Sequence, residues 1–491
     1  MTPDRPFALL ATAGLVALLL AGCLADNQDQ AGGLAPGDDP VAAAMAAIGE
    51  PIVTFHDHND PHLHTASHNL DLLSWNTLDV SLGDNGFANF VLWQSDDGAE
   101  DLAFVAVDGD AAGGFVIADI ADPDAVSVLG RYWVDGNSIQ EVRVTPDGQT
   151  AFMNVQDIPD PNAWTDGDGP RDCTVCIHVV DVSDRAAPQL LQILPVELLG
   201  THNFHVEEVD DDVFLYYVGQ PLYLPYPDPG NHVYISQLVD TPLGPRLVPV
   251  GSFDHNEVQK EGRSFPHDVL VQEHPVTGQR VAYVSHWDGG VVTFDVTDPL
   301  LPVKMGVNAE MAPSDALAIH WVMQEETARD DEDRPLGRVI AWSAPEIGGL
   351  ETGSGLIRAY DATDPGALVQ IGTWELPGDV TIEGAYTMSP HTAIPNQDNT
   401  LLAVGHYHAG VWILDITDPT QPRHVAFYQP HGDPAAPYDG PLWWKKPNFD
   451  PEGYGPNVYQ ARWDPDEPTL LWVTDRGTGL YAFEYTGPVP S

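Results

Sequence analysis

The sequence predicts an all-β protein folded as a seven-bladed β-propeller, a closed ring of small four-stranded sheets. Three observations lead to this prediction. A strand-and-turn unit recurs along the chain, the spacing of its copies gives seven units, and the two ends of the chain complement each other. Signals for helices are nearly absent. Repetition of one such unit is the mark of a repeat fold, in which each unit packs on its neighbours and a chain of 491 residues can form one domain.

The repeated unit is clearest at residues 289–302, where the apolar run GGVVTF leads into Asp-x-Thr-Asp-Pro. The apolar run is typical of a strand that is buried on both faces. Proline has no amide hydrogen to give to a ladder, and Asp and Thr side chains can bond the amides of a turn, so we assign Asp-x-Thr-Asp-Pro to turn structure. Further copies lie at residues 114–123, 355–365 and 410–422, with a degraded copy at 176–188.

The spacing of the units gives their number. Their first aspartates are separated by 62, 114, 66 and 54 residues, so the long interval must contain a unit that lacks the signature. Residues 234–245 fall in the middle of that interval, and residues 479–485 form a last, weaker copy. The total is seven. The aspartates are Asp119, Asp181, Asp295, Asp361 and Asp415.

The two ends of the chain predict how the ring closes. Residues 69–75 resemble the strand that elsewhere follows the Asp-Pro turn, yet they precede the first unit, whereas the last unit ends without such a strand. We therefore expect the N-terminal strand to complete the last blade of a propeller over residues 69–491, which leaves no long exposed edge. In the fourth blade we expect strands at residues 267–272, 280–285, 290–295 and from 303.

The first 23 residues predict a lipoprotein signal peptide. A short apolar run follows Arg5 and ends in Leu-Ala-Gly-Cys, a lipobox in which Cys23 would be lipidated after cleavage. The run is short for a membrane span. Residues 24–68 are expected to be a flexible acidic tether that ends in a histidine-rich segment, for which metal binding and a solvated loop are equally consistent. The mature protein is then extracytoplasmic, held by its lipid alone on the outer face of the cytoplasmic membrane.

The charge balance is extreme, with 19 basic residues against 73 acidic ones and a net charge of −54. Such a surface repels itself in dilute buffer, whereas a Debye length of about 3 Å in molar salt removes most of the repulsion. The composition therefore favours a halophilic protein. It disfavours nucleic acid as a partner, because no basic patch is available to meet phosphate. We expect a monomer.

The chain has three cysteines. With Cys23 used for lipidation, Cys173 and Cys176 remain, and outside the cell a short disulfide between them is the expected state. A Cys-Cys-His metal site that includes His178 is the alternative. Haem attachment does not fit, because it requires the histidine directly after the second cysteine.

The repeats resemble the LVIVD-repeat family of secreted propellers, whose consensus is an apolar strand followed by V-D-x-S/T-D-P-x-x-P. The resemblance covers five units well and two poorly, nearly the whole mature chain, and it implies a propeller at the cell surface without implying an activity. By blade count and histidine placement alone, the chain is also similar to propellers of the selenium-binding-protein type, which include metal-dependent methanethiol oxidases.

The histidines fall at two places in the predicted blades: the starts of the innermost strands and the loops between the second and third strands. Because neighbouring strands run antiparallel, both places are expected at one mouth of the central channel. Imidazoles from separate strands, with a carboxylate to complete the shell, suit Zn, Cu or Fe. In the other interpretation each histidine bonds neighbouring backbone carbonyls. The candidates are His202, His205, His267, His320 and His391 at strand starts, and His286, Glu346, His406 and His408 in the loops.

No nucleophile elbow, phosphate loop, dinucleotide fingerprint or zincin helix is present in the sequence. We therefore expect a surface lipoprotein whose propeller binds a ligand or a surface protein without catalysis. The alternative is an oxidoreductase that depends on a transition metal, Cu, Zn or Fe, held by histidines at the channel mouth. No other cofactor is expected.

Overall fold

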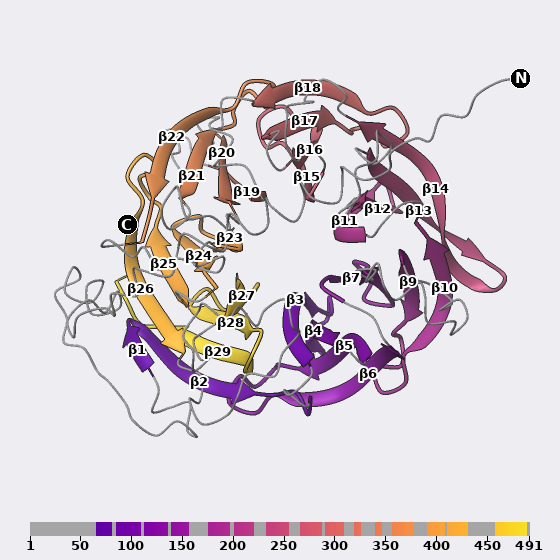
Figure 1. Ribbon diagram of the computed structural model, residues 1–491, viewed down its shortest axis with the longest axis horizontal. Helices are drawn as coiled ribbons and strands as arrows, with labels where there is room; N and C mark the ends of the chain where they lie inside the picture. The colour runs from indigo at the N-terminus through magenta and orange to yellow at the C-terminus, as the bar shows by residue number, and fades with distance from the viewer. Residues whose placement is uncertain are drawn as a thin grey trace, which may run out of the picture.

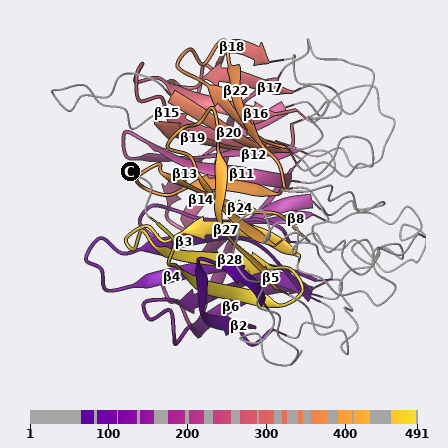
Figure 2. The ribbon, with the colours of Figure 1, turned by 90° about the vertical axis from the view of Figure 1, so that its left-hand side faces the viewer.

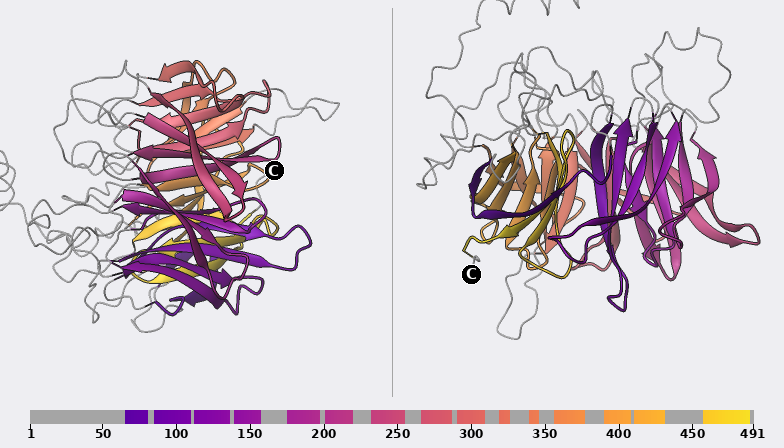
Figure 3. Two further views of the ribbon diagram at one scale, coloured as in Figure 1. Left: turned by 90° about the vertical axis from the view of Figure 1, so that its right-hand side faces the viewer. Right: turned by 90° about the horizontal axis from the view of Figure 1, so that it is seen from below.

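The computed structural model is a ring of seven sheets around one axis (Figure 1), which confirms the predicted seven-bladed β-propeller. All the elements in the part of the chain that it describes are β-strands. That part contains no helix long and apolar enough to cross a membrane. Seen from its edges, the ring is a set of sheets standing side by side (Figures 2 and 3). The structure describes residues 65–80, 85–109, 112–135, 139–156, 175–196, 201–219, 232–254, 266–286, 290–308, 319–325, 339–345, 356–376, 390–407, 410–430 and 457–488.

Blades one to six each consist of four consecutive antiparallel strands, of which the first lies nearest the axis and the fourth lies on the rim (Figure 1). The strands of blade four differ from their predicted bounds by one residue at most where the two can be compared. Blade one is β3 (Asn85–Gln94), β4 (Asp101–Gly109), β5 (Ala112–Asp119) and β6 (Ser127–Asp135); blade two is β7 (Val142–Val144), β8 (Thr150–Gln156), β9 (Val175–Asp181) and β10 (Gln189–Pro195); blade three is β11 (Thr201–Val209), β12 (Asp212–Gly219), β13 (His232–Thr241) and β14 (Gly244–Asp254). Blade four is β15 (Asp268–Glu273), β16 (Arg280–Ser285), β17 (Val291–Asp295) and β18 (Val303–Asn308); blade five is β19 (Ile319–Glu325), β20 (Val339–Pro345), β21 (Ile357–Asp361) and β22 (Val369–Trp374); blade six is β23 (Thr392–Pro395), β24 (Leu401–Gly405), β25 (Val411–Asp415) and β26 (Arg423–Pro430).

Blade seven joins the two ends of the chain, as the sequence predicts. Its inner strands are β27 (Val458–Trp463), β28 (Leu470–Asp475) and β29 (Gly479–Tyr485), and its rim strand is β2 (Leu70–Asn76). β2 runs antiparallel to β29 from Leu70 opposite Tyr485 to Asn76 opposite Leu480. The indole of Trp75 adds a hydrogen bond of 2.7 Å to the carbonyl of Thr478. The N-terminal strand therefore closes the ring.

A further strand, β1 (Thr65–His68), precedes the closing strand and was not expected. It pairs with β26 as a fifth strand on the rim of blade six. Asn69, with a φ of 54°, turns the chain from blade six to blade seven, and its side chain donates to the carbonyl of Val425 at 2.8 Å. The sheets thus begin at residue 65, within the segment that the sequence assigns to the tether.

The Asp-x-Thr-Asp-Pro segments are turns whose aspartates bond the backbone. In each of the five units the first aspartate accepts a hydrogen bond of 2.9–3.1 Å from the amide two residues later. The second aspartate repeats this contact with the same range of distances. The assignment of this motif to turn structure is confirmed, since these carboxylates satisfy the amides that follow the third strand.

Every blade also has a β-bulge at the same place, in the pairing of its third strand with its rim strand. In three blades the residue at this place is a glycine that touches the turn of the next blade. A Cβ on Gly130, Gly306 or Gly372 would lie 2.0–2.1 Å from a backbone oxygen of that turn. The absence of a side chain therefore lets neighbouring blades pack closely at the rim.

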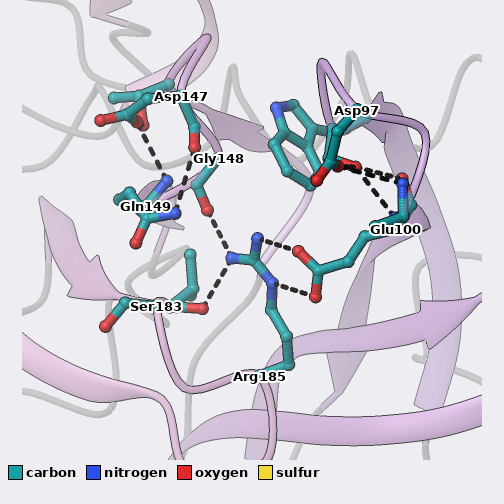
Figure 4. Close-up of polar contacts among 12 residues, drawn as sticks. Asp97, Glu100, Asp147, Gly148, Gln149, Ser183 and Arg185 are labelled. Carbon is teal, nitrogen blue, oxygen red and sulfur yellow. Dashed lines mark hydrogen bonds and ion pairs between the residues drawn. The ribbon is translucent and has the colours of Figure 1, made fainter.

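In the degraded unit of blade two, Arg185 stands where the other units have proline, and it bonds to blade one (Figure 4). Its guanidinium donates to the carbonyls of Gly148 and Val182 and forms an ion pair of 2.8 Å with Glu100. It also lies 4.9 Å from the centre of the Trp93 ring. The departure from the repeat consensus thus provides a contact between blades one and two.

Candidate functional site

In blades four and six, the two predicted histidine positions lie next to each other at one end of the sheet. The backbone amide of His267 donates to the carbonyl of Ser285, the neighbour of His286, at 2.7 Å. The equivalent bond joins His391 to the residue before His406, also at 2.7 Å. All four histidines are buried. In these two blades, the start of the innermost strand and the loop between the second and third strands therefore share one mouth, as antiparallel order requires.

The ring of His391 connects blade six to blade seven. Its Nδ1 lies 2.9 Å from the carbonyl oxygen of Tyr459, and the centres of the two rings are 3.7 Å apart. A carbonyl oxygen can only accept, so Nδ1 carries the hydrogen of this bond. For His391 the contact matches the structural interpretation, in which a histidine at a strand start bonds a neighbouring carbonyl.

Two of the histidines, from blades three and four, lie close together. The ring centres of His202 and His267 are 4.4 Å apart, with 42° between the ring planes. Asn203 places the second ring by donating to the carbonyl of His267 at 3.3 Å. Among the residues that the structure describes, no set of three His, Cys, Asp or Glu side chains is arranged to hold a metal ion. The structure thus brings together two of the predicted ligands.

His205 lies elsewhere, because β11 begins four residues earlier, at Thr201. It stands opposite Tyr216 within the sheet, and its Nε2 is 3.4 Å from Glu207. The other oxygen of Glu207 accepts from Arg280 of blade four at 2.7 Å. His202, rather than His205, therefore occupies the start of the strand.

The remaining candidates are described in part or lie outside the described residues. The backbone of His320 belongs to β19 and pairs with Ala344. Cys176 is buried in β9 and is disulfide-bonded. His178 accepts or donates a hydrogen bond of 2.9 Å with the hydroxyl of Tyr132, and burial lowers the pKa of His178 to about 4. Glu346, His408, Cys173 and Cys23 lie outside the described residues.

Near the axis the structure reveals a polar cluster that sequence reasoning missed, and we call Asn89, Glu141, Arg143 and Arg462 the axis cluster. Glu141 is 1% exposed, accepts a hydrogen bond of 2.5 Å from the side chain of Asn89, and pairs with Arg143 through its other oxygen. These contacts join blades one and two, and Arg462 belongs to the innermost strand of blade seven.

The charges of the axis cluster act on one another. Burial raises the pKa of Glu141 to about 7; the charge of Arg143 opposes this rise and that of Asp268 in blade four adds to it. Burial, and then the charge of Arg143, lower the pKa of Arg462 to about 10, with Glu141 acting in the opposite direction. Charged side chains of blades two, four and seven are therefore coupled electrostatically around the axis.

Hydrogen bonds between strands of neighbouring blades hold polar side chains in place near the axis, and one of them, from Asn154, comes from a second strand, β8. Gln460 of blade seven accepts from the amide of Phe90 in blade one at 2.6 Å. Asn154 of blade two donates to the carbonyl of Thr201 in blade three at 3.0 Å. With the contacts of Asn89, Asn203 and His391, polar side chains link five of the blade junctions near the axis. For Gln460, Asn203 and His391 the visible signal is a polar residue near the start of an innermost strand, although its partner lies 64 to 370 residues away.

Comparison with known proteins gives no family. No protein-family model matches the chain, and no curated protein matches it. Among solved structures it is similar to a protein from Lactobacillus plantarum at 13% identity, over 66% of this chain and 79% of the other, with a TM-score of 0.42. It is also similar to a proposed 6-phosphogluconolactonase from Bacteroides fragilis at 12% identity, over 80% and 88% of the two chains, again with a TM-score of 0.42.

Proposed function

We propose that the protein is a surface lipoprotein of a halophile, of the LVIVD-repeat kind, whose propeller binds a ligand at its axis. The observation that carries this proposal is the joining of innermost strands by polar side chains, among them His391 to Tyr459 and Gln460 to Phe90. Such bonds fix the geometry of the ring before a ligand arrives, which reduces the entropic cost of binding. The lipobox at Cys23 and the net charge of −54 support the location and the saline environment.

A thermal-shift screen of the mature chain in molar potassium chloride tests the binding function. Small polar metabolites are added one at a time, and a ligand that binds the folded state raises the midpoint of unfolding. At a ligand concentration of 100 times Kd the stabilisation is about 2.7 kcal/mol. A screen without any stabilising ligand contradicts the proposal. The anchor is tested separately: Cys23→Ser should move the protein from the membrane fraction to the medium.

The contact between His202 and His267 favours a second candidate, a metal-dependent oxidoreductase. Elemental analysis of protein purified in high salt without chelators distinguishes the two. Stoichiometric Cu, Zn or Fe that is lost in His267→Ala would favour the oxidoreductase. His274→Ala is the matched control, because His274 is also buried but follows the other end of β15 and bonds the carbonyl of Ala362 at 2.9 Å. Metal lost equally in both variants would indicate a general loss of structure.

A further inference from the structure

The axis cluster contains one hydrogen-bond acceptor and one donor that lack partners. Asn89 is only 4% exposed, and its Oδ1 has no hydrogen-bond partner although its Nδ2 donates to Glu141. The Nε of Arg462 is shielded from solvent and also has none. A buried polar group without a partner destabilises the folded state, and more so when it is charged. A ligand that supplies both partners would recover this energy.

The charge of the cluster specifies an anion. Arg143 and Arg462 are both cations, and Glu141 is the one carboxylate of the cluster. Asp268 acts on Glu141 from blade four. Two arginines near the axis are a marked concentration of positive charge in a chain with 19 basic residues against 73 acidic ones. The planar guanidinium matches the geometry of a carboxylate, so a carboxylate is the group expected at Arg462.

The unpaired acceptor specifies the second group of the ligand. An ammonium carries three donors and would be repelled by two guanidinium groups, whereas Asn89 offers a single unpaired oxygen. A hydroxyl needs one acceptor and carries no charge. Glu141 does not compete for it, because its oxygens already meet Asn89 and Arg143. The cluster therefore matches a hydroxyl beside a carboxylate.

We propose that the axis cluster binds a small 2-hydroxy acid, with its carboxylate on Arg462 and its hydroxyl donating to Asn89 Oδ1. This inference rests on the proposed binding function and names the class of ligand. The side chain of Arg143 is 22% exposed, so solvent reaches the cluster from that side.

Equilibrium dialysis of the mature chain tests this site, with lactate as the probe and propionate, which differs from it only by lacking the hydroxyl, as its comparison. All measurements use one concentration of potassium chloride, so that competition by chloride is the same throughout. We expect lactate to bind about threefold to tenfold more tightly than propionate, the value of one hydrogen bond. Asn89→Ala should remove this preference.

Arg462→Gln should weaken lactate binding at least about tenfold, because the hydrogen bond it removes is charge-assisted. Arg131→Gln is the matched control: it removes the same charge from the rim strand of blade one and should leave the affinity unchanged. The midpoint of unfolding of each variant shows whether it is folded, and the ratio of the affinities for lactate and propionate is measured in the unchanged protein and needs no variant. Equal affinity for the two acids, or lactate binding unaltered in Arg462→Gln, overturns the proposal. If another compound from the thermal-shift screen binds and lactate does not, this inference fails while the binding function stands.

Discussion

The contact of Gly306 with the next blade predicts a large effect of a single methyl group. A Cβ on Gly306 would lie 2.1 Å from the carbonyl oxygen of Gly366, 2.6 Å from its carbonyl carbon and 2.9 Å from its Cα. These are backbone atoms of the turn in blade five, so the rim strand of blade four or that turn must move. Overpacking of this kind costs about 1–3 kcal/mol.

Gly251 is a matched control for this substitution. It lies in the rim strand of blade three, and a Cβ there would meet nothing within 4 Å. Replacing glycine with alanine also lowers the conformational entropy of the unfolded chain. This raises the free energy of unfolding by about 0.4–1 kcal/mol in both variants. The difference between Gly306→Ala and Gly251→Ala should therefore equal the overpacking cost alone, about 1–3 kcal/mol.

Urea unfolding at constant molar salt measures this difference, since urea is uncharged and leaves the ionic strength unchanged. The slope of the unfolding free energy against urea must be the same in both variants for the midpoints to be compared. Equal midpoints would refute the inference that the glycine is required by the turn of the neighbouring blade.

Four further perturbations have definite expected outcomes. Arg185→Met should destabilise the protein by about 2 kcal/mol in urea, because two carbonyls lose a donor; Glu100→Gln should cost less, because Glu100 is partly exposed. Deleting the chain through Trp75 should lower the melting temperature and promote aggregation, whereas deletion through Glu50 should not; equal melts would contradict closure by β2. Burial holds the pKa of His178 at about 4, below that of the unfolded chain, so stability should fall as the pH drops from about 6.5 to 4, and His178→Phe should flatten this dependence. The melting temperature should rise steeply between low and molar salt; a constant value would count against the halophilic interpretation.

The sequence predicts the ring and its closure well because both follow from local, repeated signals. The Asp-Pro turns are recognisable since each aspartate bonds an amide two residues away. The shared mouth of His267 and His286 follows from strand order, because the strand that leads away from the mouth is followed by one that returns to it. The bulges were missed although a signal is visible: an apolar residue followed by glycine recurs in the rim strands at residues 305–306 and 371–372.

The axis cluster could not be predicted in the same way. Asn89 and Glu141 are 52 residues apart, and nothing in either strand identifies the other. The position of a side chain near the axis also depends on the exact start of its strand, and of the two histidines expected at the start of this strand only His202 lies there. β1 gave no signal because Thr65–His68 is short and belongs to a histidine-rich segment without the alternation of a strand.

The position of β1 determines how the propeller responds to mechanical force. β1 bonds to blade six and β2 to blade seven, and Asn69 alone separates them. A pull on the N-terminal segment therefore acts first on the four residue pairs of β1 and reaches β2 only after they separate. With the lipid anchor that we propose at Cys23, shear from the surrounding fluid would act first on this short strand, and its loss would leave the four strands of each of the seven blades in place.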